Sequence, residues 1–483
     1  MTESKLARQL AAMNSREQER FRQFVASPYF NQHQPTQQLL DLLLEGIEQG
    51  GSALDRKRLF HKLFGRNTAY KEQRLADLMS GIMKLLGQFL SIEQLKEEPL
   101  LGEVLTLRRA EANGRYDLLK GRYKRLGRML KESNFRDKKV LEASYQSNAI
   151  YGYYRTSHED RGDQEMVQGM FYDLDRYYII EKLRHACHMS ANMLVMNTTY
   201  DFSLLDQVLD FMKSDKGQEL FQNEPSIRCY YHILMTMRDS DNLQHYEQLM
   251  EFLNSGLDQL SPAEQRDLYL FSNNYCILRI RQGDQRFPRE LFDLFQRGIA
   301  TGLIYQKNQI DEWAFKNVVT LGSKLGEYEW TENFIDSHYE KLPDNRRENA
   351  YTLNKAQFLY SRGRYEEAGD LLRVVNDSDV KYHLARVLLQ VRIAYEQKES
   401  TYLLNQLETF RLYVLRQKKI STNDKRSYIN YSRFAKQLVN LRFQSQYYDK
   451  EVFKKKLEAL HQKIVATKLL VGREWLITES RPQ

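Results

Sequence analysis

One short turn motif, which recurs between helical segments, constrains the fold of this chain most strongly. In "SRGRYEEAGDLLRVV" (residues 361–375), a Tyr follows Gly363 by two residues and an Ala follows that Tyr by three. Related turns lie at Gly114 and Gly326, with weaker ones at Gly283 and near Ser240 and Glu399. From Ser240 onward, successive turns are separated by 43, 43, 37 and 36 residues. Intervals of roughly 34 to 47 residues are typical of stacked helix pairs, so the motif predicts a series of helical hairpins.

Apolar residues recur with helical rather than alternating spacing in nearly every segment, which predicts an all-α fold. Ser15 precedes Gln18 by three residues, a capping-box spacing that marks the start of a helix. Residues 72–92 place one apolar stripe on a long helix: Leu75, Leu78, Met79, Ile82, Leu85, Leu86 and Phe89. We expect a helical cap over residues 1–95, helical repeats over 96–410, and basic C-terminal helices over 411–483 that continue the stack.

The repeats resemble the tetratricopeptide-repeat (TPR) family. In that family a small residue lies in the first helix, Gly marks the turn, an aromatic follows two residues later, and Ala lies near the start of the second helix. The matching residues are Ala356, Gly363, Tyr365 and Ala368 in one repeat, Gly326 and Tyr328 in the preceding one, and Gly114 and Tyr116 in a weaker copy. The likeness covers about residues 312 to 375 and is degraded elsewhere. It implies an all-α right-handed superhelix of antiparallel helix pairs, a TPR-like α-solenoid with an N-terminal helical cap.

The layout of the whole chain also looks like an uncharacterised family of bacterial helical-repeat proteins. The stretches that carry this likeness are "FRQFVASPYFN", "KRLFHKLFG" and "FKNVVTLGSKLGEYEWTENFI". This resemblance implies no particular activity, so any functional expectation depends on the residues themselves.

The cysteines and the N-terminal sequence indicate a cytoplasmic protein. Cys187, Cys229 and Cys276 lie far apart, without the paired spacing of a disulfide framework or a C-x-x-C zinc site. The N-terminal stretch lacks the apolar core of a secretory signal, and no apolar run reaches the roughly 18 residues of a membrane span. We therefore expect a protein of a reducing compartment, without a membrane partner.

Motifs that would indicate an enzyme are missing from the sequence. It contains no G-x-x-x-x-G-K, no G-x-G-x-x-G after a strand, no G-x-S-x-G and no H-E-x-x-H. We expect no enzymatic activity and no cofactor.

A possible metal site is the exception. Glu181, His185 and His188 stand at i, i+4 and i+7, so their side chains share one helix face and could supply three ligands to zinc or iron. The alternative is a polar face opposite the apolar Ile180 and Leu183. Because the sequence shows no fourth ligand, we expect no bound metal.

Charge is distributed unevenly along the chain. Residues 1–107 sum to +1, 108–140 to +8, 141–410 to −12 and 411–483 to +11. The final segment includes the run Lys454, Lys455 and Lys456, a candidate ionic contact. Its charge could serve as a solvated end of the stack, could meet an acidic protein surface, including that of a second copy, or could bind nucleic acid.

These observations favour a non-enzymatic scaffold that binds a peptide or partner protein on its helical-repeat surface. Self-association is a further possibility. The alternative is a nucleic-acid or ribonucleoprotein binder that uses the basic segments 108–140 and 411–473. We favour protein over nucleic acid, because no RNA- or DNA-binding motif accompanies the basic residues.

Overall fold

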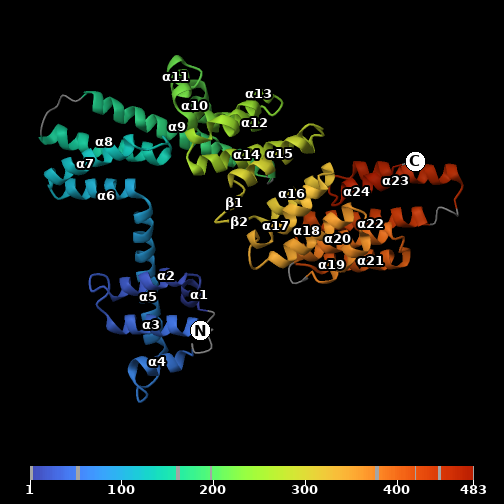
Figure 1. The fold of residues 1–483 in the computed structure, drawn as a ribbon, viewed down its shortest axis with the longest axis horizontal. Helices are drawn as coiled ribbons and strands as arrows, with labels where there is room; N and C mark the ends of the chain where they lie inside the picture. Colours follow the sequence, from blue (N-terminus) through green and yellow to red (C-terminus); the bar gives the residue numbers. More distant parts are fainter. Residues whose placement is uncertain are drawn as a thin grey trace. The chain divides into compact units, whose positions relative to one another are not determined.

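The computed structural model describes residues 4–49, 55–158, 164–195, 198–375, 380–418, 420–443 and 448–481. These residues form 24 α-helices and a single two-stranded hairpin, together with one π-helical and two 3-10 segments. The prediction of an all-α fold is confirmed (Figure 1). Consecutive helices contact one another along most of the chain, which is compatible with a helical repeat.

The chain divides into two compact units. Unit 1 comprises Met1–Arg228 and Gln259–Ser261, and unit 2 comprises Cys229–Asp258 and Pro262–Gln483. The domain limits expected from the sequence, at residues 95 and 410, fall inside these units and stay predictions.

Unit 1 contains eleven described helices and the start of a twelfth. Their bounds are α1 (Lys5–Ala11), α2 (Ser15–Ala26), α3 (Gln34–Glu48), α4 (Arg56–Phe64), α5 (Glu72–Glu97), α6 (Pro99–Ala112), α7 (Tyr116–Lys131), α8 (Lys138–His158), α9 (Gln164–Val195), α10 (Leu205–Phe211), α11 (Asp215–Asn223) and α12 (Pro225–Arg238). One apolar core is shared by α1 to α5 and another by α6 to α8.

The start of α2 differs by one residue from the sequence prediction. Asn14, rather than Ser15, caps the helix: its side chain accepts from Glu17 N, and the Glu17 carboxylate accepts from Asn14 N, each at 2.9 Å. The capping pair Ser15–Gln18 is therefore wrong. Two overlapping pairs of suitable residue types stand side by side here, and spacing alone does not choose between them.

Helix α5 is long because a single apolar stripe runs along most of it. Its buried residues are Leu75, Leu78, Ile82, Leu85, Leu86 and Phe89. Among the described helices, α5 is the one that is long and apolar enough to cross a membrane by length and composition. The same stripe packs in the core with α1 to α4, and a core helix meets that criterion equally well.

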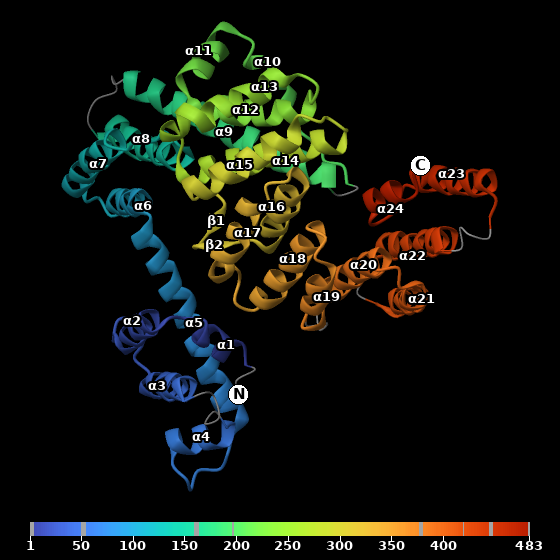
Figure 2. The same cartoon turned by 45° about the vertical axis from the view of Figure 1, so that its right-hand side comes forward.

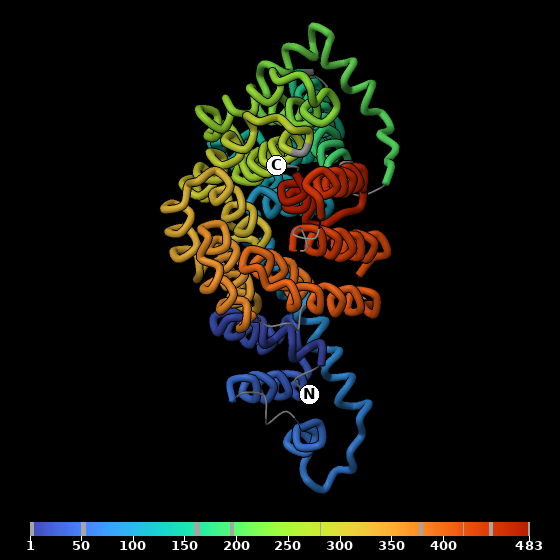
Figure 3. The backbone as a smooth tube through the Cα atoms, turned by 90° about the vertical axis from the view of Figure 1, so that its right-hand side faces the viewer, coloured from blue at the N-terminus to red at the C-terminus, as the bar shows by residue number. Residues whose placement is uncertain are grey.

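Unit 2 continues from α12 to the end of the described chain. Its elements are α13 (Leu243–Glu251), the π-helix η1 (Phe252–Gly256), the 3-10 segment η2 (Leu257–Gln259), α14 (Pro262–Arg281), α15 (Phe287–Thr301), β1 (Tyr305–Gln306), β2 (Gln309–Ile310), the 3-10 segment η3 (Tyr339–Lys341), α16 (Glu312–Leu325), α17 (Tyr328–Ser337), α18 (Arg347–Ser361), α19 (Tyr365–Arg373), α20 (Val380–Glu396), α21 (Ser400–Arg416), α22 (Thr422–Phe443), α23 (Lys450–Ala466) and α24 (Arg473–Glu479). From α16 to α23, each odd-numbered helix packs against the even-numbered helix before it (Figure 2). The chain doubles back between the helices of each pair (Figure 3).

Five turns between helices share one hydrogen-bond pattern. The residue in the left-handed region is Gly114 (φ 64°), Gly283 (φ 93°), Gly326 (φ 79°), Gly363 (φ 73°) or Lys398 (φ 60°). Its own N–H donates to the carbonyl three residues earlier, and the next N–H donates to the carbonyl five residues earlier. The latter bonds measure 2.8 to 3.1 Å. This is the Schellman geometry, which satisfies the last carbonyls of a helix and reverses the chain.

The predicted repeat residues occupy equivalent places around these turns. Tyr116, Tyr328 and Tyr365 are the first residues of α7, α17 and α19, two positions after the glycine. Ala356 on α18 and Ala368 on α19 are both fully buried in one small core. Small side chains at these two positions let the paired helices approach closely.

Candidate functional site

Helices α16 and α20 converge at their N-terminal ends, although α18 and α19 separate them in the sequence. Tyr382 on α20 donates a hydrogen bond from Oη to Glu312 Oε2 on α16, at 2.6 Å. These residues are 70 positions apart. In a row of helix pairs, such a contact across the intervening pair requires that the helices lean together on this side.

An exposed tryptophan lies at this convergence. Trp313 on α16 is 47% exposed. Lys316 Nζ, also on α16, lies 5.4 Å from the centre of the indole ring, and Lys381 Nζ on α20 lies 5.3 Å from it. Both distances are within the range of cation–π attraction, which is strongest for tryptophan. We call Glu312, Trp313, Lys316, Lys381 and Tyr382 the Trp313 face.

The Trp313 face carries a net positive charge. The Glu312 carboxylate is only 11% exposed and accepts from both Tyr382 and Arg346, so its charge is compensated. Loss of hydration lowers the pKa of Lys316, and the Arg392 guanidinium on α20 lowers it further. The face therefore offers an aromatic ring between cations, an arrangement that suits recognition rather than proton transfer.

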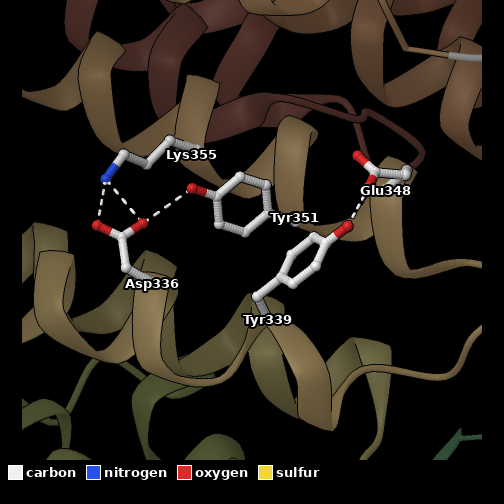
Figure 4. A pocket seen from close by; sticks show the side chains of 5 residues that line it. All are labelled: Asp336, Tyr339, Glu348, Tyr351 and Lys355. Carbon is white, nitrogen blue, oxygen red and sulfur yellow. Dashed lines mark hydrogen bonds and ion pairs between the residues drawn. The ribbon is translucent and has the colours of Figure 1, made fainter.

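A second feature is an open hollow of about 540 Å³ between the end of α17, η3 and α18. Five polar side chains line it: Asp336, Tyr339, Glu348, Tyr351 and Lys355 (Figure 4). Asp336 accepts from Tyr351 Oη at 2.9 Å and from Lys355 Nζ at 2.9 Å. On the other side of the hollow, Tyr339 Oη donates to Glu348 (Figure 4).

The polar groups of the hollow are bonded in two separate sets. The two tyrosine rings meet edge to face, with centroids 5.1 Å apart. Burial, together with the hydrogen bond to Asp336, raises the pKa of Tyr351 to about 12. A phenol with that pKa stays protonated near neutral pH, so Tyr351 remains the donor in its hydrogen bond to Asp336.

The candidate metal ligands of α9 are engaged elsewhere. Glu181 accepts from Arg184 Nε at 2.9 Å, and its carboxylate also lies 3.5 Å from Lys138 Nζ. His185 Nε2 is 3.6 Å from the same carboxylate, with its side chain 64% exposed. Burial acts to raise the pKa of Glu181, but the hydrogen bond and charge of Arg184 and the charge of Lys138 outweigh it and the pKa is lowered.

No metal-binding group of three His, Cys, Asp or Glu residues is present in the described part of the chain. A metal ion at Glu181 would have to displace two cations. The expectation of no metal remains a prediction, which elemental analysis of protein purified without chelator would test.

The three cysteines are buried. Burial raises the pKa of the Cys276 thiol to about 12 and that of Cys229 well above its ordinary value. Because the thiolate is the reactive form, neither residue is activated as a nucleophile.

The two basic segments differ in how far their cations are paired with carboxylates. In segment 108–140, ion pairs between described residues engage at least five of the twelve cations: Arg122 and Arg125 with Glu103, Arg136 with Glu224, Lys138 with Glu181, and Lys139 with Glu98. Much of this positive charge is thus neutralised inside unit 1. It is less available for a polyanion than the sequence suggested.

In the C-terminal segment, Lys454, Lys455 and Lys456 are exposed on α23. Lys456 Nζ lies 4.0 Å from the centre of the Tyr448 ring. The opposite side of α23 is buried in the core through Leu457, Leu460 and Ile464. Lys419, which belongs to the same basic segment, lies outside the described residues.

No sequence pattern indicated the Trp313 face. Trp313 and Lys381 are 68 residues apart, and their proximity depends on how three helix pairs stack. We found no match to this chain among protein-family models, curated proteins or solved structures.

Proposed function

We propose that the protein is a non-enzymatic scaffold that binds a partner protein or peptide on the helical-repeat surface of unit 2. The helix pairs from α16 to α23 would form part of a TPR-like right-handed superhelix, with the even-numbered helices lining its inner side. A cytoplasmic location fits the three reduced, buried cysteines.

The observation that supports this proposal most directly is the half-exposed Trp313 between two lysines. A large aromatic side chain costs free energy when it is left in water, and Trp is enriched at the energetic centres of protein interfaces. The two cations keep the ring oriented, so a partner would meet a preorganised surface.

The test compares two variants in co-purification from the native cell, with bound proteins quantified by mass spectrometry. Trp313→Ala should reduce recovery of the specific partner by about tenfold or more, the effect of losing one interface hot spot. Tyr402→Ala is the matched control, because Tyr402 on α21 is also 47% exposed. Equal recovery from both variants would contradict the proposal.

The second candidate function is nucleic-acid binding by the C-terminal basic segment. The exposure of Lys454, Lys455 and Lys456 favours this function. Among the described residues, none of the three forms an ion pair with a carboxylate. Retention of the pure protein on RNA should then fall steeply with salt and be lost on Lys454→Glu, Lys455→Glu and Lys456→Glu together. If the wild-type protein is not retained on RNA even at low salt, nucleic-acid binding by this segment is excluded.

A further inference from the structure

The last described helix, α24, packs back against the preceding helix pairs instead of extending the row. Its residues Trp475 and Leu476 are buried. The Trp475 ring lies 5.2 Å from that of Tyr395 on α20 and 6.1 Å from that of Tyr431 on α22. The Arg392 guanidinium on α20 lies 6.0 Å from the indole centre. The helix thus inserts an indole between two tyrosines and a cation.

The ends of α24 reach further. Glu474 Oε1 lies 3.5 Å from Lys324 Nζ at the C-terminal end of α16. At its other end, the carbonyl of Glu479 accepts from the Arg442 guanidinium at 2.7 Å. Helix α24 therefore spans residues of α16, α20 and α22.

The docking of α24 is chemically incomplete. Two buried donor groups have no hydrogen-bond partner among the described residues: Arg392 Nε and Trp475 Nε1. A buried donor without an acceptor costs about 1–3 kcal/mol relative to its hydrated state. The site therefore holds α24 by apolar burial, an ion pair and the hydrogen bond from Arg442, while these particular donors have no partner among the described residues.

The chain enters α24 through a closely packed glycine. Gly472 precedes the helix with φ 64°, and a Cβ there would lie 2.8 Å from the Tyr431 ring. The helix itself is only seven residues long, too short to be stable without its packing contacts. For the helix to leave, the buried contacts of Trp475 and Leu476 and the bonds at both of its ends would have to break.

We propose that α24 is an internal occupant of the partner-binding surface, and that the partner presents a segment of the same chemistry. This inference rests on the proposed scaffold function and specifies the surface. The partner segment would carry an indole or similarly large aromatic side chain, to insert between Tyr395 and Tyr431. A carboxylate beside it would meet Lys324, and a hydrogen-bond acceptor would satisfy the donors that α24 leaves unpaired.

The argument for a protein segment rather than a nucleic acid comes from α24 itself. Its contacts combine a buried leucine, a buried indole and one exposed carboxylate–ammonium pair. A polyanion would satisfy the cations but not the apolar surface that α24 covers.

The first experiment measures binding of a labelled peptide of residues 470–481 to the full chain. In the variant Trp475→Ala with Leu476→Ala, the chain's own α24 loses its anchors, so the peptide should bind saturably. It should bind the wild type about tenfold or more weakly, because the tethered helix competes at high effective concentration. Thr478→Ala, on the exposed side of α24, is the matched control and should behave as the wild type.

The second experiment locks α24 in place reversibly. Lys324→Cys with Glu474→Cys is joined by a bis-methanethiosulfonate linker matched in length, while the three native cysteines are buried and protected. The peptide should not bind the linked protein and should bind again at wild-type strength once the linker is reduced. The single variants Lys324→Cys and Glu474→Cys control for the substitutions.

The outcomes separate this inference from the function on which it rests. Absence of peptide binding to the released variant, or equal binding before and after linkage, overturns the inference even if Trp313→Ala abolishes partner recovery. Peptide binding together with unchanged partner recovery from Trp313→Ala contradicts the proposed function at that face alone. Binding of a single-stranded RNA, but not the peptide, to the released variant would overturn the inference in favour of a nucleic-acid site.

Discussion

Lys398 adopts a left-handed backbone conformation with φ 60°. Gly363 adopts the same conformation at the equivalent place of the preceding turn, with φ 73°. The left-handed conformation costs a residue with a Cβ about 1 kcal/mol more than glycine. Lys398→Gly should therefore raise the free energy of unfolding by up to about 1 kcal/mol. Gly363→Ala should lower it by a similar amount, although no atom lies within 4 Å of the added methyl group. Denaturant titrations that show the same sign for both variants would contradict the common turn geometry.

The contribution of the single residue Glu396 to folding stability should depend on pH. Burial raises its pKa above the ordinary 4.5, and the facing Glu479 carboxylate raises it further, against the opposing hydrogen bond from Tyr360 Oη at 3.4 Å. Tyr365 and Tyr395 also face this carboxylate. The folded state therefore binds the proton more tightly than the unfolded state. The stabilisation by protonation is complete below about pH 4.5 and is lost as the pH rises through the folded-state pKa.

It follows that Glu396→Gln should be more stable than the wild type near pH 7 and lose this advantage towards pH 4.5. The measurement is the difference in Tm between the two proteins across that range. A difference that is constant with pH would mean that Glu396 does not titrate with a raised pKa.

At the scale of helices, Ala368 tests the close approach of α18 and α19. Because Ala368 is fully buried beside Ala356 and Leu372, Ala368→Leu should overpack the contact at a cost of about 1–3 kcal/mol. Gly369 is the matched control. It lies next in the same helix with open space around its Cα, so Gly369→Ala should stabilise by about 0.5–1 kcal/mol. Unchanged thermal stability of Ala368→Leu would contradict the packing of this pair.

Helices and turns were predictable from sequence because their causes are local. The glycine at each turn is required by backbone geometry, and the apolar stripe of α5 follows from helical spacing alone. Pro35 near the start of α3, and Asp55 and Gly65 at the two ends of α4, are local signals of the same kind. Lys398 was missed as a left-handed residue because a lysine gives no such signal.

The candidate site was not predictable, because its residues come from helices that are distant in sequence and meet only when the helix pairs stack. Nothing near Trp313 in the sequence indicates that Lys381 will approach it, and nothing in "REWLITE" indicates that α24 will reach Lys324. The sequence suggested basic segments instead. In the first of them, the structure shows cations already paired with carboxylates, such as Arg122 with Glu103 and Arg136 with Glu224.

For the whole molecule, the run Lys454 to Lys456 predicts a salt-dependent association. A net charge of +11 over residues 411–483 creates self-repulsion that an acidic surface would relieve. Reversal of all three lysines to Glu should weaken partner recovery or self-association. The wild-type interaction should weaken as salt rises past roughly 0.15 M, where the screening length is about 8 Å. If neither partner recovery in pull-down nor the sedimentation behaviour changes with the charge reversal or with salt, this end is only a solvated surface.

The contact of α24 with α16 joins residues 150 positions apart and encloses the helix pairs between them. In an open row of hairpins, contacts are confined to neighbours, and each end frays on its own. A bond from the last helix to α16 turns that row into a closed loop, whose members open together. Amide hydrogens from α16 to α22 should therefore exchange with similar free energies while α24 is docked, and with graded ones after Trp475→Ala with Leu476→Ala. Seven residues at one end would thus decide whether this part of the protein unfolds piece by piece or in a single step.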